Sequence, residues 1–303
     1  MVSTIQVRNL GRTYGAARAV DGISFEVAEG EIFGLVGPNG AGKTTTIECL
    51  EGLRRPTSGH VRVLGMDPSA ERRAVAERIG VQLQESALPS RLRVEEALTL
   101  FRSLYRRHLE VDSLLELLSL TEKRTTAFAK LSGGQKQRLF IALALVNEPE
   151  VVFLDELTTG LDPQARRSMW DLVRQIRDRG RTVVLTTHYM EEAERLCDRV
   201  MIVDRGRIVA MDTPGALIAA LGADTRMVFS APGQDVSSLS RLAAVTRVER
   251  SDSHVVVYGH GDRFASSVIH ALEDAEIVFT DFRTEEPDLE DVFLSLTGKE
   301  IRQ

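Results

Sequence analysis

Residues 37–44 read Gly37-Pro38-Asn39-Gly40-Ala41-Gly42-Lys43-Thr44. They match the pattern GxxxxGK[ST] at every fixed position, between a short apolar segment (32–36) and a segment of helical character (about 43–52). Glycines let backbone N–H groups approach a phosphate closely, and a helix N-terminus adds free donors. Lys43 supplies a mobile positive charge, and the Thr44 hydroxyl can ligate Mg²⁺. The stretch therefore predicts a site for the phosphates of a nucleotide.

A second motif places two adjacent acids after an apolar segment: Val151-Val152-Phe153-Leu154-Asp155-Glu156. The apolar residues predict a buried strand, and Asp155 then emerges at its carboxyl end, where ligands of α/β proteins bind. We expect Asp155 to hold Mg²⁺ through water. Glu156 should point to a different side and polarise the water that attacks a phosphate. The alternative, a pair of acids on the surface, is disfavoured by the intact phosphate loop.

A third motif separates this chain from kinases, GTPases and helicases, which can share the first two. It is Leu131-Ser132-Gly133-Gly134-Gln135, a serine and two glycines at the start of a predicted helix. Such a helix start is a second anion-binding terminus. The phosphate loop already has a helix end of its own, so this one is expected to complete a site on another subunit. With these motifs the chain resembles the ATPase of an ABC transporter, whose signature is LSGGQ.

The resemblance covers about residues 3–217 and implies roles for further residues. Tyr14 matches the aromatic residue that stacks on adenine. Gln84 matches a glutamine that contacts Mg²⁺ and water and senses the membrane partner; Gln82 is its rival, and spacing favours Gln84. Asp162 matches a loop that touches the site of the opposite subunit. His188 matches the histidine that contacts the γ-phosphate and positions the catalytic glutamate.

The expected site can now be stated in full. Glu156 and His188 are the catalytic residues, and Thr44, Gln84 and Asp155 are the Mg²⁺ ligands. The residues expected to bind ATP are Tyr14, Gly37, Pro38, Asn39, Gly40, Ala41, Gly42, Lys43, Thr44, Thr45, Gln84, Leu131, Ser132, Gly133, Gly134, Gln135 and Asp162. The chain departs from the family at Leu157, where proline is usual. This departure removes no catalytic group and bears on the rate of hydrolysis rather than on its type.

The order of elements predicts an α/β fold of the P-loop NTPase (ABC ATPase) class, with a mainly parallel sheet and helices on both faces. The ABC nucleotide-binding domain is expected over 1–222, with a helical subdomain at about 85–135. Within that subdomain, the family receives a helix from the membrane subunit. Single elements include strands flanking Gly59, a helix at about 69–78, and a linker at 217–224.

Residues 223–303 are expected to form a small α+β accessory domain of ferredoxin-like type. Its predicted elements are strands at 227–230, 245–249, 255–258 and 277–282, and helices at 236–242, 264–272 and from 289. The end of the chain, 287–298, is similar to that of bacterial drug- and antibiotic-exporter ATPases of the daunorubicin-resistance type. In the last helix Leu289, Val292, Phe293 and Leu296 form one apolar stripe. This stripe either closes the core of the small domain or meets the same region of a second chain.

Composition limits the remaining possibilities. The 303 residues carry a net charge of −6, which argues against nucleic acid as a partner. The longest apolar run, 139–146, is far shorter than the roughly 20 residues that span a bilayer. We therefore expect the chain at the cytoplasmic face of the cell membrane, held there by a separate transmembrane permease. Cys49 and Cys197 lie in predicted helices and are expected to be buried, reduced thiols.

These observations predict the ATP-hydrolysing subunit of an ABC exporter for drugs or antibiotics. It would act as a homodimer, or paired with another ATPase subunit, that closes over two ATP·Mg²⁺. One alternative is an ABC ATPase that acts on ribosomes or DNA. Such proteins usually hold two domains in one chain or a long coiled coil, and this chain has one set of motifs and no heptad tract. A non-hydrolytic ATP-gated module is the other alternative, and the intact Lys43, Asp155, Glu156 and His188 speak against it.

Overall fold

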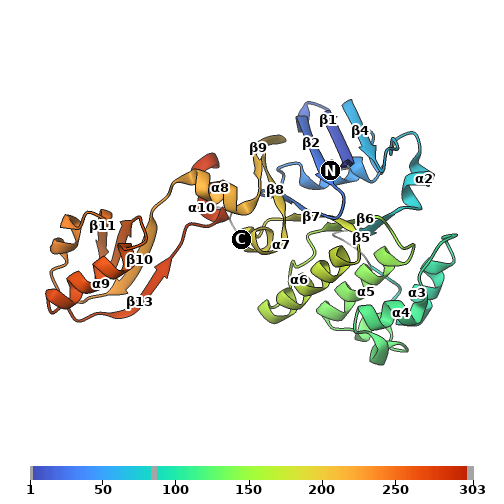
Figure 1. Ribbon diagram of the computed structural model, residues 1–303. Coiled ribbons are helices and arrows are strands. Elements are labelled where there is room, and N and C mark those ends of the chain that lie inside the picture. The colour runs from blue at the N-terminus through green and yellow to red at the C-terminus, as the bar shows by residue number, and fades with distance from the viewer. Residues whose placement is uncertain (1–2, 83–86, 299–303) are drawn as a thin grey trace. The chain divides into compact units, whose positions relative to one another are not determined.

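The structure is a computed structural model that describes residues 3–82 and 87–298. The chain divides into two compact units, and the division lies between Pro214 and Gly215 (Figure 1). This division falls at the start of helix α8 (Pro214–Leu221). The sequence suggested a boundary later in the chain, after residue 222. In the part of the chain that the structure describes, no helix has the length and apolar character that a bilayer crossing requires.

The first unit is built on a sheet with the strand order β5-β6-β7-β3-β8-β9. The strands are β3 (Ile32–Val36), β5 (Ile79–Gln82), β6 (Val151–Asp155), β7 (Thr182–Thr187), β8 (Arg199–Asp204) and β9 (Arg207–Asp212). All neighbouring pairs are parallel except β8 with β9. Strands β3, β6 and β7 are buried along their whole length, which is why they read as continuous apolar segments. The predicted, mainly parallel sheet is confirmed.

A second, antiparallel sheet covers part of the first unit, with the order β2-β1-β4. Its strands are β1 (Ser3–Tyr14), β2 (Ala17–Ala28) and β4 (Ser58–Val63). Its buried residues join helix α1 (Lys43–Leu50) and one face of the parallel sheet in a single core. Phe25 of β2 stacks on Phe33 of β3 at 5.6 Å between ring centroids. This core fixes α1, and with it the phosphate loop, against two sheets at once.

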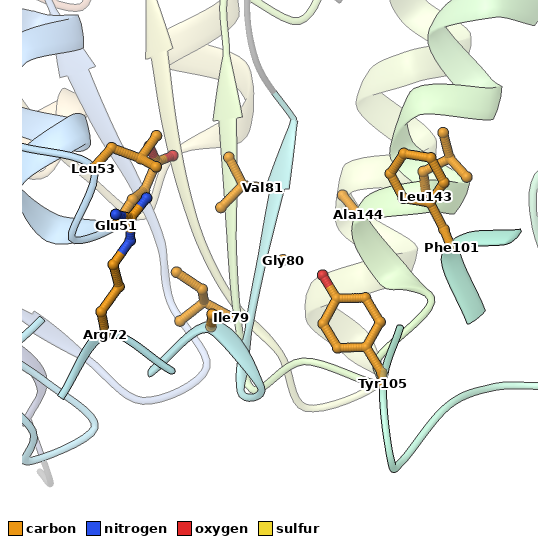
Figure 2. Close-up of a pocket in the computed structure, with 11 residues that line it drawn as sticks. Glu51, Leu53, Arg72, Ile79, Gly80, Val81, Phe101, Tyr105, Leu143 and Ala144 are labelled. Atoms are coloured by element: carbon orange, nitrogen blue, oxygen red, sulfur yellow. The ribbon is translucent and has the colours of Figure 1, made fainter. Parts of the chain in front are cut away.

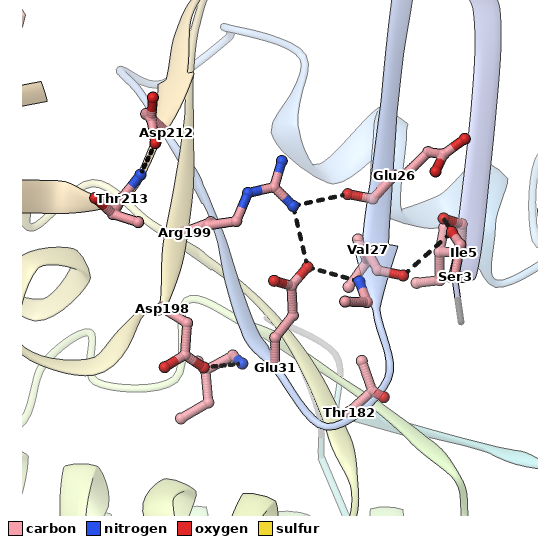
Figure 3. Close-up of polar contacts among 12 residues, drawn as sticks. Ser3, Ile5, Glu26, Val27, Glu31, Thr182, Asp198, Arg199, Asp212 and Thr213 are labelled. Atoms are coloured by element: carbon pink, nitrogen blue, oxygen red, sulfur yellow. Dashed lines mark hydrogen bonds and ion pairs between the residues drawn. The ribbon is translucent and has the colours of Figure 1, made fainter. Parts of the chain in front are cut away.

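The turn that leads into β3 is held by side chains that lie just before and at the start of β8 (Figure 3). Glu31 accepts the backbone N–H of Ala28 at 2.8 Å and pairs with Arg199 at 3.4 Å. Asp198 accepts the backbone N–H of Ile32 at 2.8 Å. Burial raises the pKa of the Glu31 carboxyl, and the donors at Ala28 and Arg199 oppose that rise. These contacts therefore fix where strand β3 enters the sheet. They also fix where the phosphate loop, which follows β3, begins.

Most helices of the first unit lie on the side of the parallel sheet that faces away from β1, β2 and β4 (Figure 1). The helices that follow α1 in this unit are α2 (Arg72–Ala76), α3 (Val94–Arg102), α4 (Val111–Leu117), α5 (Gly133–Leu145), α6 (Pro163–Asp178) and α7 (Met190–Leu196), with 3₁₀ turns at Thr121–Lys123 and Phe128–Lys130. Helices α3 and α4 contact each other and α5. Cys49 in α1 and Cys197 after α7 are both free and buried, as predicted.

Two predictions for the first unit were wrong in detail. The predicted helix at 69–78 is limited to α2, because the Asp67 carboxylate accepts the backbone N–H of Ser69 at 2.8 Å and turns the chain there. The strands expected on both sides of Gly59 are the one strand β4. Gly59 lies inside it with φ of 83°, where a side chain would collide with the backbone of Asn9.

The second unit contains a four-stranded antiparallel sheet with the order β11-β12-β10-β13. Its elements are β10 (Thr225–Ser230), a 3₁₀ turn (Ser237–Arg241), β11 (Val245–Ser251), β12 (His254–Gly259), α9 (Phe264–Asp274), β13 (Thr280–Glu285) and α10 (Leu289–Thr297). The core lies between the sheet and α9, with Phe229, Val257 and Val268 fully buried. On α10, Leu289, Val292 and Phe293 are buried, whereas Leu296 is 47% exposed.

Three predictions for this region need correction. The predicted linker at 217–224 begins inside helix α8, which Pro214 starts and alanine and leucine residues favour. The predicted helix at 236–242 is only a 3₁₀ turn, because the Asp235 side chain accepts the backbone N–H of Ser237 at 3.0 Å. The last strand begins at Thr280 rather than at Ile277, which is buried in the core before the strand.

Candidate functional site

The phosphate loop closes around the side chain of Lys43. Gly42 precedes α1 with φ of 103°, and a side chain there would collide with the carbonyl oxygen of Ala19, so glycine is required. The Lys43 ammonium donates to the carbonyl oxygens of Gly37 at 2.8 Å and Pro38 at 3.2 Å. Gly42 makes no side-chain cap, so the first N–H groups of α1 remain available to an anion.

A cavity of about 420 Å³ adjoins this loop, with room for a polyanionic ligand. Its lining residues are Ala19, Asn39, Gly40, Gly42, Lys43, Thr44, Thr45 and Glu156. Lys43 is 5% exposed, and its burial lowers the pKa of the ammonium, while the carboxylates of Glu156 and Asp155 act in the opposite direction. The cavity therefore presents a buried positive charge that lies close to acidic side chains.

Asp155 ends β6, as the sequence predicted, and is 4% exposed. Thr186, on the neighbouring strand β7, donates its hydroxyl to the Asp155 carboxylate. Burial raises the pKa of this carboxyl, and hydrogen bonds from Thr186 and Thr44 lower it. Two oxygen ligands that suit Mg²⁺, the Asp155 carboxylate and the Thr44 hydroxyl, are thus in contact beside the phosphate loop. The third predicted ligand, Gln84, lies outside the described residues.

Glu156 turns away from Asp155 because its backbone takes the left-handed conformation, with φ of 48°. Its N–H is bonded to both the carbonyl oxygen and the hydroxyl of Thr186, at 3.2 and 3.1 Å. The Glu156 carboxylate lies 3.9 Å from the Lys43 ammonium and 3.5 Å from Nδ1 of His188. Lys43, Glu156 and His188, which come from three separate segments of the sequence, therefore meet at one point.

The signature segment starts helix α5 and lies elsewhere on the unit. Ser132 caps α5: its Oγ accepts the N–H of Gln135 at 3.3 Å, and the Gln135 side chain accepts the N–H of Ser132 at 3.0 Å. A methyl group on Gly134 would lie 3.8 Å from Ala165, at the start of α6. Asp162 caps that helix by accepting the N–H of Ala165 at 2.9 Å. Two helix N-termini are thus side by side, and the described lining of the phosphate cavity includes neither.

Tyr14 ends β1 and is 39% exposed. The Arg12 guanidinium lies 4.6 Å from the centre of its ring, and that of Arg54 lies 5.9 Å away. The ring is therefore accessible and already flanked by planar cations. Tyr14 pairs with Ala17 of β2, the strand that contributes Ala19 to the phosphate cavity.

Comparison with known proteins follows this geometry. Residues 20–159 match a family model described as ABC transporter. Daunorubicin resistance ATP-binding protein DrrA3 of Streptomyces coeruleorubidus is 39% identical over 308 residues, which cover 99% of this chain and 98% of that protein. The chain belongs to the ABC transporter family. Nod factor export ATP-binding protein I of Paraburkholderia xenovorans is 40% identical over 308 residues, with 99% of both chains covered.

Solved structures agree with this assignment to the ABC transporter family. An ATP-binding subunit of an ABC transporter superposes with a TM-score of 0.65 at 29% identity, covering 72% of this chain and 93% of its own. The cbiO1 protein of Clostridium perfringens, part of the transporter complex cbiONQ, gives 0.66 at 27% identity, with 72% and 92% covered. The dimeric bacterial ABC cassette MJ0796 gives 0.61 at 26% identity, with 69% and 98% covered. The chain is thus an ABC ATPase, the ATP-binding subunit of a transporter.

Sequence reasoning missed two residues that support the site. Thr186 bonds both acids, and its only signal was its place at the carboxyl end of a strand beside β6. Glu192, on α7, is 2% exposed; it accepts the indole N–H of Trp170 at 3.0 Å and a hydrogen bond from the side chain of Thr187, the residue before His188. Burial raises the pKa of this carboxyl.

Proposed function

We propose that this ABC ATPase drives export of a drug or antibiotic through a separate transmembrane permease, and that Glu156 activates the water that hydrolyses ATP. The observation that carries the proposal is the meeting of Lys43, Glu156 and His188 beside the phosphate cavity. The names of the relatives, which refer to daunorubicin resistance and Nod factor export, support export as the task. The family places such subunits at the cytoplasmic face of the membrane, through the permease.

The proposed roles follow from the geometry. Backbone N–H groups at the start of α1 and the Lys43 ammonium bind the β and γ phosphates. Thr44 and Asp155 hold Mg²⁺, which when bound neutralises charge on those phosphates. Glu156 orients and polarises the attacking water, and His188 positions the Glu156 carboxylate from 3.5 Å. Tyr14 offers its exposed ring to the adenine.

We further propose that two chains act together, either as a homodimer or as a pair with another ATPase subunit. Ser132, Gly133 and Asp162 of one chain would face the ATP held by residues 37–45 of the other. The exposure of Ser132 and Gly133 supports this, as does the pairing of two helix N-termini at one place on the surface. The net charge of −6 gives no reason to include nucleic acid among the partners.

The same proposal assigns residues 1–222 to the nucleotide-binding domain, with its helical subdomain at about 85–135, and residues 223–303 to an accessory domain. A ferredoxin-like fold for the accessory domain is supported by the order β11-β12-β10-β13 and by α9 between β12 and β13. The 3₁₀ turn at Ser237–Arg241 stands where such a fold has its first helix.

Glu156→Gln tests the central assignment. Removal of the carboxylate should lower the rate of ATP hydrolysis by at least about 100-fold, because the amide cannot polarise water. ATP binding should persist, so the variant should accumulate as a dimer when ATP and Mg²⁺ are present, as seen by size-exclusion chromatography.

Glu150→Gln is the matched control, since Glu150 precedes the same strand and pairs with Arg78 at the surface. It should hydrolyse ATP at nearly the wild-type rate. If Glu156→Gln hydrolysed ATP at the wild-type rate, Glu156 could not have its proposed role.

A further inference from the structure

A groove of about 290 Å³ runs along strand β5, with Glu51, Leu53 and Arg72 on one side of the strand and helices α3 and α5 on the other (Figure 2). Its lining residues are Glu51, Leu53, Arg72, Ala76, Ile79, Gly80, Val81, Phe101, Tyr105, Leu143 and Ala144. Most of this surface is apolar, and Leu53 on it is 44% exposed. Leu104, beside Tyr105 in the chain, is 66% exposed. Such apolar exposure around one groove is typical of a surface that a partner covers.

One carboxyl interrupts this apolar surface. Glu51 follows the last turn of α1 and is 5% exposed, and its Oε2 has no hydrogen-bond partner. Among the described residues no basic side chain pairs with it, and its acidic neighbours Glu48 and Asp155 add repulsion. A carboxylate at a helix C-terminus also opposes the helix dipole. Burial, followed by the two acids, raises the pKa of Glu51 to about 8.

We propose that Glu51 selects the partner of this groove: an amphipathic helix of the permease that carries one lysine or arginine among its apolar side chains. This inference rests on the proposed function, which supplies the permease. Its new content is the chemistry of the docking segment. The apolar lining receives the apolar face of the helix, and the cation pairs with the buried carboxyl. A helix without the cation would leave Glu51 buried and unpaired.

The charged and titratable groups around Glu51 determine whether a proton is released when the helix docks. Arg72 lines the same groove from α2, and the Tyr105 hydroxyl is directed toward strand β5 (Figure 2). Glu48 and Asp155 repel the charged form of Glu51. Near neutral pH Glu51 is protonated in the free chain, because its pKa is about 8. Docking of an ammonium group turns this acid into a carboxylate ion pair. Up to one proton per docked helix is therefore released to the buffer.

The test uses the full chain and a panel of stapled amphipathic helical peptides. Members differ only in where a single lysine replaces norleucine on the apolar face. Binding is measured by titration calorimetry at pH 7 in two buffers with different ionisation enthalpies, which yields affinity and proton release together. At least one lysine peptide should bind about tenfold more tightly than the all-norleucine peptide, with release of a proton.

Glu51→Gln should abolish both the lysine preference and the proton release while still binding the norleucine peptide. Glu71→Gln, which removes an exposed carboxyl outside the groove, should change neither. A lysine preference that survives in Glu51→Gln overturns the inference, as does a panel in which no peptide binds. Proton release that appears only in Arg72→Ala would show that Arg72 already serves as the cation, which also overturns it.

A second copy of the chain is the rival occupant. Self-association in sedimentation experiments that Glu51→Gln abolishes would assign the groove to that copy and reject the permease helix. The proposed function is tested separately: it would be rejected if the wild-type chain did not hydrolyse ATP. Normal hydrolysis without any lysine preference rejects this inference alone.

Discussion

Asp155 and Glu51 are both buried carboxyls of the first unit, yet their surroundings give them different tasks. Asp155 receives hydrogen bonds from Thr186 and Thr44 and lies close to the Lys43 ammonium, so its charged form is supported. Glu51 has one oxygen without a hydrogen-bond partner, and the charged groups that raise its pKa are both acids. Burial raises the pKa of both carboxyls, but hydrogen bonds and the Lys43 ammonium oppose the rise at Asp155, whereas acidic neighbours add to it at Glu51.

Glu51→Gln should change how stability depends on pH. The pKa of Glu51 is about 8 in the folded chain against 4.5 for the ordinary group, so the folded state holds this proton more tightly. Folded-state stability should then fall as pH rises from about 4.5 to 8, by at most roughly 1.4 kcal/mol per pH unit. The glutamine variant lacks this loss and should melt at a higher temperature than wild type at pH 8.5.

Thermal melts of both proteins at pH 5 and pH 8.5 measure the effect. At pH 5 the difference should be small, since wild-type Glu51 is then protonated. Glu71→Gln serves again as the exposed control and should follow wild type at both values. A glutamine variant that loses stability at pH 8.5 would mean that the Glu51 carboxylate is favourably paired in the folded chain.

At the scale of elements, three helix N-termini in the first unit are finished in different ways. Helix α1 begins at Gly42 without a side-chain cap, which leaves its N–H groups to a ligand. Ser132 and Asp162 close the starts of α5 and α6 with their own side chains. The uncapped helix is the one beside the phosphate cavity, and the capped pair is exposed. Helix starts with related dipoles thus serve different purposes.

Asp162→Ala should destabilise α6, because it removes the acceptor of the Ala165 N–H, at a cost of about 1 kcal/mol. Asp162→Asn keeps an acceptor and should restore most of that loss. Trp170, the single tryptophan, lies buried on α6, so urea unfolding followed by its fluorescence reports on this helix.

Asp178→Ala, at the opposite end of α6, is the matched control. Its carboxylate faces the negative end of the helix dipole, so its removal should leave stability unchanged or slightly raised. Equal losses in Asp162→Ala and Asp178→Ala would rule out capping as the cause.

The phosphate loop of the candidate site could be proposed from the sequence because its residues form one local motif. Gly37 to Thr44 need only a strand before them and a helix after them, and the sequence displays both. Glu51 could not be recognised, since the groove that it lines with Ile79, Tyr105 and Ala144 is assembled from segments that are distant in the sequence. Thr186 escaped for the same reason, because its contact with Asp155 exists only once β6 and β7 pair.

The β8–β9 hairpin and helix α8 were missed although local signals for both existed in the sequence. Strands β8 and β9 meet at the two-residue turn Arg205-Gly206, where both residues have positive φ, the pattern of a tight hairpin. The segment 217–224 was interpreted by its glycine and alanine content, whereas Pro214 and the alanines and leucines after it favour the observed α8. Composition suggested a linker where the propensity of each residue suggested a helix.

For the whole molecule, the proposed function makes one chain half of a catalytic unit. The phosphate cavity is lined by residues from β2, the phosphate loop, α1 and the end of β6, and the described lining includes no signature residue. Ser132 and Gly133 are exposed at the start of α5. A twofold pairing would bring each exposed signature to the cavity of the other chain and complete two sites at once. This arrangement makes a prediction that no single-chain mechanism shares.

Two inactive variants should restore activity when they are paired. In a heterodimer of Lys43→Ala with Ser132→Arg, one site carries both lesions and the other carries neither. The pair should recover up to roughly half of the wild-type rate if the sites act independently, and less if they are coupled. Each variant alone should be inactive, because every site then carries one lesion. Heterodimers purified through two different affinity tags allow the ATP hydrolysis rate to be measured without the parent homodimers.

Ser238→Arg, at an exposed serine of the second unit, controls for the added arginine and should hydrolyse ATP normally. Substantial hydrolysis by Ser132→Arg alone would refute the role of Ser132, since arginine at the start of α5 would then leave both sites intact.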